Sequence, residues 1–155
     1  LPKNHPDRAR ASQMAARLAR EMLAEAGFPA DKLDAVAHAI EAHSFSAGIT
    51  PLTIEAKIVQ DADRMDALGA VGLARMFFTA GRMGSALAHP DDPLATAREA
   101  NDTAFSLDHI EVKLATLPAM MNTEAARRLG EERVAWLRAF RATFVAEWGG
   151  GQTEA

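Results

Sequence analysis

Apolar residues recur at intervals of three and four along most of the chain, and no stretch shows the alternation with period two that is typical of a half-buried strand. In the first such segment Met14, Leu18 and Met22 lie one helical turn apart, with charged residues between them. This periodicity predicts an all-α fold of about five or six helices.

Residues that begin and end helices divide the pattern into segments. The predicted helices cover residues 7–26, 31–44, 53–80, 95–117 and 123–148. Asp31 and Thr123 are predicted N-caps, and Gly27 is predicted to end the first helix. The 53–80 segment is expected to be one long helix or a pair broken near Gly69 or Gly72.

Length and composition limit the class of protein. A chain of 155 residues is long enough for one domain, which we predict over residues 1–148 with a flexible tail at 149–155. The net charge of −4 argues against a nucleic-acid partner, and no apolar run is long enough to predict a membrane span. The absence of cysteine excludes disulfides and zinc–thiolate sites. We therefore expect a soluble cytoplasmic protein, whose oligomeric state the sequence leaves open.

The segment DADRMDALGA (61–70) places four charged residues in a predicted helix that is otherwise apolar over most of its circumference. Such a helix is typical of a central position in the core, where unpaired charges are costly. Asp63 and Asp66 are three residues apart and would share a face. Two explanations stay open: a solvated polar patch with an Asp61–Arg64 pair, or a carboxylate metal ligand on a rigid helix.

Two histidines lie in the stretch HAIEAHSFSAG (38–48). A spacing of five residues separates His38 and His43 by about 140° on an ideal helix, so they are not expected to bind one metal ion together. His43 lies at a predicted helix end before a loop, where functional residues gather, and it ranks above His38. Each can equally be a partly buried, hydrogen-bonded histidine.

Other polar residues are weaker candidates. Lys3 and Asn4 precede the first predicted helix, where free backbone N–H groups favour an anion, although an ordinary polar loop and cap is the favoured explanation of these residues taken alone. His89 is expected to be exposed in a loop. His109 and Lys113 lie one helical turn apart and are expected on the surface.

The stretch EAKIVQDADRMDALGAVGLARMF (55–77) resembles the closing segment of the HD-domain phosphohydrolases, and more specifically their YedJ-like branch. Four further stretches resemble that branch in the same order: PKNHPDRARAS (2–12), HAIEAHSFSAG (38–48), LDHIEVKLATLPAMMNT (107–123) and the EW that ends the last helix (147–148). The resemblance spans nearly the whole chain and implies an HD-domain-like helical bundle.

The resemblance also implies a chemistry. The family holds a divalent ion (Mn, Mg, Ni, Fe or Co) with a His, a His-Asp pair and a later Asp in an A-D-R triplet, here Asp63. The implied reaction is hydrolysis of a phosphate ester or anhydride by metal-activated water, with a nucleotide as the implied substrate. Asp63 and His43 are then the implied catalytic residues. The implied substrate contacts are Lys3, Asn4, His38, Arg64 and Lys113.

The chain departs from the family pattern in one respect. It contains no His-Asp dipeptide, and in relatives the first three ligands precede the PKN stretch with which this chain opens. We therefore expect this segment alone to be inactive and, because it starts at Leu1, the missing helices to exist in a longer protein. The alternative is a degenerate HD module that binds a ligand or partner without catalysis. A helical interaction protein that docks through residues 123–148 is a third, weaker hypothesis.

Overall fold

The computed structural model describes residues 7, 10–44 and 47–148, and within them every regular element is helical. The predicted all-α class is therefore confirmed. None of the described helices is long and apolar enough to cross a membrane. The chain divides into two compact units, Leu1–Arg64 and Met65–Ala155, each of which is described by itself. The single domain predicted over residues 1–148 stays a prediction.

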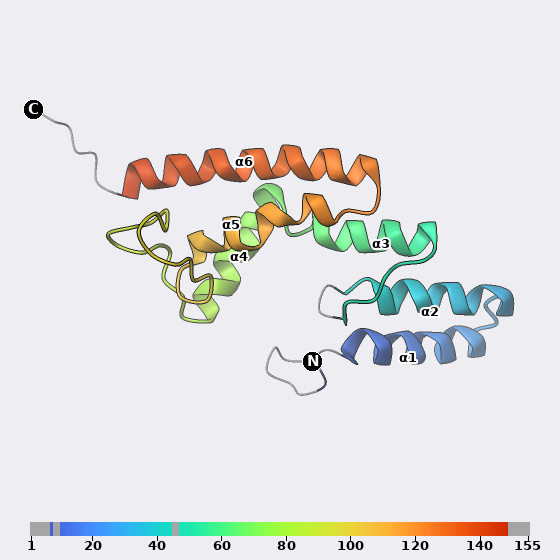
Figure 1. Cartoon of the computed structure of the whole chain (residues 1–155). Helices are drawn as coiled ribbons and strands as arrows, with labels where there is room; N and C mark the ends of the chain where they lie inside the picture. The colour runs from blue at the N-terminus through green and yellow to red at the C-terminus, as the bar shows by residue number, and fades with distance from the viewer. Residues whose placement is uncertain (1–6, 8–9, 45–46, 149–155) are drawn as a thin grey trace, which may run out of the picture. The chain divides into compact units, whose positions relative to one another are not determined.

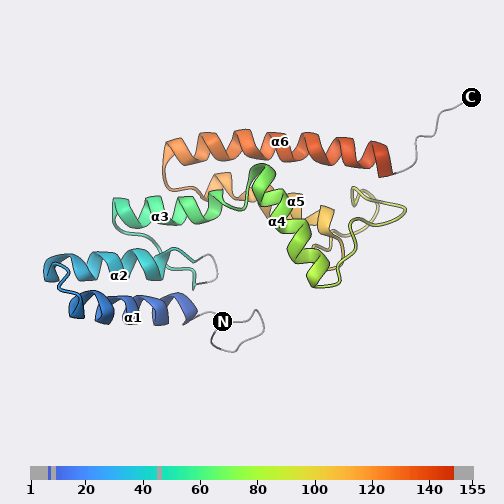
Figure 2. The ribbon, with the colours of Figure 1, turned by 180° about the vertical axis from the view of Figure 1, so that it is seen from behind.

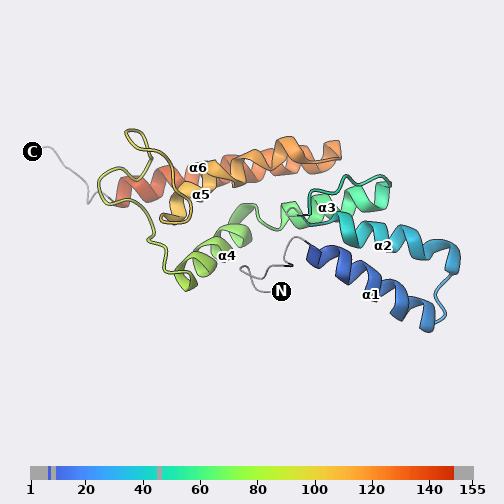
Figure 3. The same cartoon turned by 60° about the horizontal axis from the view of Figure 1, so that its bottom comes forward.

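In its described residues the first unit contains three α-helices. Helix α1 (Ala11–Glu25) is followed by the 3-10 turn η2 (Ala30–Lys32) and by α2 (Leu33–Ala42). Figures 1 and 3 show α1 and α2 side by side and running in opposite directions. Helix α3 (Ile54–Met65) runs in the same direction as α2, so the C-terminal ends of α2 and α3 lie at the same end of the unit (Figures 1 and 2).

Small side chains form the packed face of α1. Ser12 and Ala16 are buried in the described structure, whereas Met14, Leu18 and Met22 are 45%, 57% and 60% exposed. Two residues correspond to about 200° of rotation, so the apolar stripe lies on the side of α1 opposite Ala16. The spacing predicted the helix correctly, but it did not predict which face packs.

The helix termini correct some of the predicted boundaries. Helix α1 begins at Ala11 rather than at residue 7. Asp31 does not cap α2, because it lies inside η2 and the N-cap residue is Lys32, which makes no side-chain cap bond. Thr123 is confirmed as a cap, since its Oγ1 accepts a hydrogen bond from the Ala126 N–H at 3.3 Å.

The predicted 53–80 segment is a pair of helices, α3 and α4 (Gly69–Arg82). The break falls at Leu68, whose backbone is extended, and at Gly69, whose φ of 75° favours glycine. The expected burial over most of the circumference is wrong for the described structure. Ile54 and Ile58 are 57% and 55% exposed because the buried face of α3 consists of Ala56, Gln60 and Asp61.

The second unit has a continuous apolar core. After α4 come η4 (Ser106–Asp108), α5 (His109–Val112), η5 (Leu114–Thr116), η6 (Pro118–Met120) and the long helix α6 (Glu124–Trp148). Its buried apolar residues are Leu68, Leu73, Ala88, Leu107, Ile110, Leu114, Leu117, Met121, Val134 and Leu137. Val134 and Leu137 of α6 are buried in this core, and Phe140 and Phe144 of the same helix pack against it.

The helix predicted over residues 95–117 is largely wrong, because residues 95–105 form an irregular loop. Asp92 accepts hydrogen bonds from the backbone N–H groups of Thr96 and Ala97, and Asn101 accepts from that of Ala104. Asp and Asn side chains that bond to nearby backbone offer the chain an alternative to the helical hydrogen bonds. Regular structure resumes only with η4.

Candidate functional site

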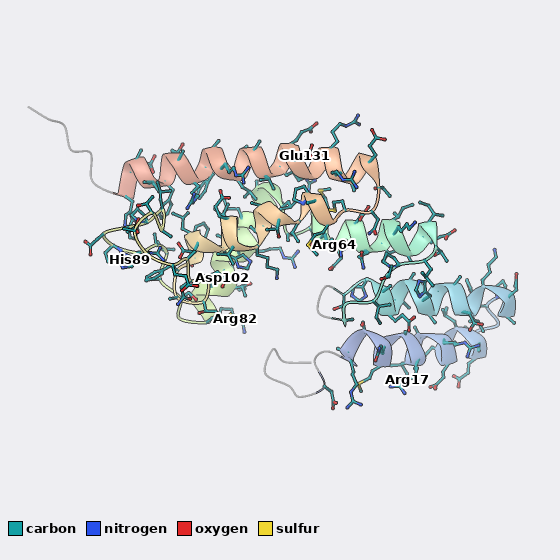
Figure 4. All side chains as sticks on the ribbon, viewed as in Figure 1. Arg17, Arg64, Arg82, His89, Asp102 and Glu131 are labelled. Carbon is teal, nitrogen blue, oxygen red and sulfur yellow. The ribbon has the colours of Figure 1, made fainter. Side chains whose placement is uncertain are left out.

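The charged segment at the end of α3 contains side chains in different environments. Asp61 is only 3% exposed, Asp63 is exposed, and Arg64 is half-buried at the C-terminal end of the helix (Figure 4). Burial lowers the pKa of the Arg64 guanidinium, and the carboxylates of Asp61 and Asp63 oppose this shift without cancelling it. The first unit therefore presents the Asp63 carboxylate at its surface, with a cation in the next position of the chain.

Asp66 does not share a helix with Asp63. Helix α3 ends at Met65, and Asp66 lies in the turn that precedes α4, where its carboxylate pairs with the Arg75 guanidinium. The predicted common face of Asp63 and Asp66 is therefore wrong, because the helical spacing rule applies only within one continuous helix. Asp66 has a local partner in the second unit.

His43 is the C-cap residue of α2, and its ring orientation is set by its own helix. The ring Nδ1–H donates to the Ile40 carbonyl oxygen at 2.6 Å. This bond leaves the proton of a neutral ring on Nδ1 and the lone pair on Nε2. Nε2 makes no hydrogen bond among the described residues. A half-buried histidine in this state can accept a proton or bind a cation at Nε2.

Both ring nitrogens of His38 make hydrogen bonds within the first unit. Its Nε2 accepts a hydrogen bond from the Leu52 N–H at 2.9 Å, and its Nδ1–H donates to the Glu41 carboxylate at 3.1 Å. The imidazole thus ties α2 to the segment that leads into α3. A substrate contact by His38 stays a prediction and would have to replace one of these two bonds.

The remaining predicted substrate contacts are Lys3, Asn4 and Lys113. Lys3 and Asn4 lie outside the described residues. Lys113 is half-buried in the second unit, between α5 and η5. Among the described residues, His38, His43, Asp63 and Arg64 belong to the first unit.

Sequence reasoning did not single out Gln60. This side chain is 3% exposed, and its Nε2 donates to the Ala42 carbonyl oxygen at 2.7 Å and to that of Ile49 at 3.4 Å. Gln60 lies one helical turn after the buried Ala56, so the two residues share the buried face of α3. A long polar side chain at this spacing from a small apolar residue was the sequence signal that could have identified Gln60. Such a side chain must find hydrogen-bond partners.

Asp108 and Asp102, which sequence analysis did not select as candidate site residues, hold the loop between α4 and η4 in place. Asp108 has no exposed side-chain surface, accepts two hydrogen bonds from Arg98 at 2.7 and 2.8 Å, and accepts a third from the Asn101 N–H. Asp102 accepts a hydrogen bond from the His109 ring at 2.8 Å. Asp108 serves the structure of the loop, since its acceptor sites face protein groups only.

His89 lies in the same loop and is not simply exposed, as was predicted. Its half-buried ring lies 5.0 Å from the Phe105 ring, and its Nδ1 accepts from the N–H groups of Asp91 and Asp92 (Figure 4). The surface position predicted for His109 is also only partly right, because its side chain is 25% exposed and bonded to Asp102. Both histidines help to order the loop between α4 and η4.

The described residues do not form a complete metal site. No group of three or more His, Asp or Glu side chains among them is arranged to hold a metal ion. Asp63 alone offers one carboxylate, which is one of the four ligands that the resemblance to the HD family implies. The part of the chain described here therefore fits the metal of an HD enzyme only as the source of one ligand.

Comparison with known proteins places this geometry in a family. Residues 4–68 match the model of the HD domain. The uncharacterized protein YpgQ of Bacillus subtilis is 43% identical over 111 residues, which are 69% of this chain and 48% of that protein. The crystal structure of YpgQ superposes with a TM-score of 0.69 at 35% identity and covers 87% of this chain and 64% of that chain.

A second solved structure agrees with this assignment. The crystal structure of an HD-superfamily hydrolase from Bacillus thuringiensis gives a TM-score of 0.68 at 33% identity, over 88% of this chain and 64% of that chain. The chain thus spans about half of the curated relative that it matches and less than two thirds of these solved chains. By sequence and fold, the chain belongs to the HD-domain superfamily.

Proposed function

We propose that the protein is a metal-dependent phosphohydrolase of the HD superfamily, and that Asp63 is one of its metal ligands. The observation that carries this proposal is the exposed carboxylate of Asp63 at the end of α3, inside the segment that matches the HD domain. The neighbouring Asp61 is 3% exposed and lies on the buried face of α3, so Asp63 is the carboxylate that this segment offers to groups from outside the unit. The YedJ-like branch stays a prediction.

The other metal ligands must come from groups outside the described residues, since those residues supply no set of three. We therefore assign this chain the carboxylate and the groups around it, and no complete catalytic centre. Arg64 follows Asp63 directly, so a phosphate group bound next to Asp63 would lie near a guanidinium cation.

His43 is the proposed group for proton transfer. Its Nδ1–H donates to the Ile40 carbonyl oxygen, so in the neutral ring Nε2 carries the lone pair and can accept a proton from a group at the end of α2. The C-terminal ends of α2 and α3 lie at the same end of the first unit, so His43 and Asp63 belong to that end (Figure 2). This placement supports a role for both residues in one site.

A nucleotide is the proposed substrate class. The support comes from a relative: YpgQ of Bacillus subtilis has been crystallised in complex with ADP, and that structure matches this chain with a TM-score of 0.65 at 35% identity. A phosphate ester or anhydride of a nucleoside would give Arg64 an anion to bind. The identity of the base is left to experiment.

The test is release of phosphate or pyrophosphate from a panel of nucleoside triphosphates, with Mn, Mg, Ni, Fe or Co supplied in turn. We expect Asp63→Ala to abolish hydrolysis while the helical circular dichroism and the melting temperature stay unchanged. Asp34→Ala is the matched control, because Asp34 is an exposed acid of the same unit that pairs only with Arg20 at 2.8 Å. Activity that survives Asp63→Ala, or an equal loss in both variants, would refute the proposal.

One observation favours a second function, that of a ligand-binding HD module without catalysis: the described residues offer no three-ligand metal group. In that case calorimetry would detect nucleotide binding, with no turnover under any metal. Asp63→Ala would then change the binding affinity little.

A further inference from the structure

The C-terminal end of α2 is closed by side chains rather than by glycine. The last carbonyl groups of a helix have no partner within the helix and need one elsewhere. Here the Ile40 carbonyl accepts from the His43 ring, and the Ala42 carbonyl accepts from Gln60 on the neighbouring helix α3. His43, which is proposed to transfer a proton, is therefore itself part of a helix cap.

Gln60 is the one of these groups that comes from α3. Its Nε2 lies 2.7 Å from the carbonyl oxygen of Ala42, the residue just before His43, and 3.4 Å from that of Ile49. The side chain is 3% exposed and the receiving Ala42 is fully buried. A buried hydrogen bond of this length fixes the peptide group between Ala42 and His43, because rotating that peptide would leave a buried carbonyl without a partner.

The same residue is rigidly connected to Asp63. Gln60 and Asp63 are three residues apart on α3, within one helical turn. The chain of contacts therefore runs from Asp63 along one turn of α3 to Gln60, across a single hydrogen bond to Ala42, and to His43 in the next position of the chain.

We infer that Gln60 is a positioning residue, which sets the place and the tautomer of the His43 ring relative to Asp63. Without its amide donor, the last peptide of α2 can rotate and the bond from His43 Nδ1–H to the Ile40 carbonyl loosens. The ring then loses the constraint that keeps the lone pair on Nε2. The expected effect on kcat rests on the proposed function, whereas the expected effect on the NMR spectrum of His43 rests on the geometry alone.

The experiment is Gln60→Met, which keeps the length of the side chain and removes its hydrogen-bond donors. In the full chain, ¹⁵N NMR of His43 is expected to show Nδ1 protonated and Nε2 unprotonated, and the variant to show a shift toward the other tautomer. In the active protein kcat is expected to fall by about 10-fold or more with little change in KM, because a small misplacement of a reacting group acts on the chemical step.

Leu33→Ala is the matched control. Leu33 is 7% exposed at the first position of α2, so its truncation destabilises the same helix at the end far from His43. We expect this variant to melt at a lower temperature and to keep the wild-type ¹⁵N spectrum of His43 and the wild-type kcat. An unchanged His43 spectrum in Gln60→Met, or an equal change in Leu33→Ala, would overturn the inference.

A measurement on the wild-type protein covers the case in which Gln60→Met does not fold. The side-chain amide protons of Gln60 should exchange slowly with solvent and show contacts to Ala42, and fast exchange would overturn the inference. The tautomer test is independent of turnover. If Asp63→Ala leaves hydrolysis intact, the proposed function fails while the positioning of His43 by Gln60 is still decided by NMR.

Discussion

Replacing Asp108 by Asn should destabilise the second unit far more than neutralising an exposed acid of the same unit does. The carboxylate has no exposed surface and receives three hydrogen bonds, two from Arg98 and one from the Asn101 N–H. Burial by itself would raise the pKa of Asp108, but these bonds outweigh it and hold the pKa below its usual value. The charged form is therefore part of the fold.

The size of the effect follows from the geometry. Asn keeps one carbonyl oxygen, which can still accept from Arg98 Nη1 and from the Asn101 N–H at the position of Oδ2. The Asn NH₂ group would take the place of Oδ1, which accepts from Arg98 Nη2–H in the wild-type protein. Two donors would then face each other, so one charge-assisted bond is lost, and the other two become weaker because the acceptor is no longer charged. At about 1.5–3 kcal/mol for a charge-assisted bond, the total cost is about 3 kcal/mol.

Urea denaturation followed by tryptophan fluorescence measures this cost, because Trp136 and Trp148 both lie in α6. With a slope of about 2 kcal/mol per M, the midpoint should fall by about 1.5 M. Asp66→Asn is the matched control: Asp66 pairs with Arg75 on the surface, where the two side chains are 63% and 62% exposed, and such pairs contribute about 0–1 kcal/mol. Equal midpoints for the two variants would refute the reasoning.

Three further predictions concern stability. Ser12→Ala should stabilise the first unit by about 1 kcal/mol, because the buried Ser12 Oγ makes no hydrogen bond among the described residues; a lower urea midpoint would contradict this. Gly72→Ala should lower the free energy of unfolding by about 2–3 kcal/mol, because the added Cβ would lie 2.2 Å from the Ala67 carbonyl oxygen. Gly81→Ala, in the same helix, places its Cβ in open space and should be neutral or stabilising. Hydrogen bonds from the backbone N–H groups of Thr96 and Ala97 lower the pKa of Asp92 from 3.8 to about 2. The loop therefore gains stability from this carboxylate above pH 3.8 and loses that stability as the pH falls toward 2. Asp92→Asn should remove this part of the acid dependence in melting curves recorded at a series of pH values.

Periodicity was sufficient for the elements that pack by regular helical faces. The α6 helix and its Thr123 cap followed from spacing and cap chemistry, and the break between α3 and α4 fell at one of the two glycines that were predicted. These features are local, since a glycine with positive φ or a hydroxyl before a helix acts within a few residues.

The failures have physical causes of longer range. The loop before η4 was predicted as helix because its side-chain acceptors, Asp92, Asn101 and Asp108, bond to backbone and to Arg98 in a way that no spacing rule shows. The packed face of α1 was missed because small residues, Ser12 and Ala16, allow the close approach of α2 while the large apolar ones stay exposed.

The candidate site was only partly accessible to sequence reasoning. The exposure of Asp63 and the burial of Asp61 depend on the rotation of α3, which apolar periodicity did not fix because Gln60 and Asp61 lie on its buried face. The tautomer of His43 depends on one hydrogen bond to Ile40, and the role of Gln60 on one to Ala42. Contacts of this kind appear only once the helices are placed beside each other.

The most direct test of the account is the metal content of the protein expressed from its complete coding sequence, measured by elemental analysis with Asp63→Ala beside it. The account predicts about one divalent ion per chain in the wild-type protein and its loss in the variant, because the exposed Asp63 carboxylate is proposed as a ligand. Absence of metal from both proteins after manganese and nickel have been supplied, or an equal metal content in both, would contradict it.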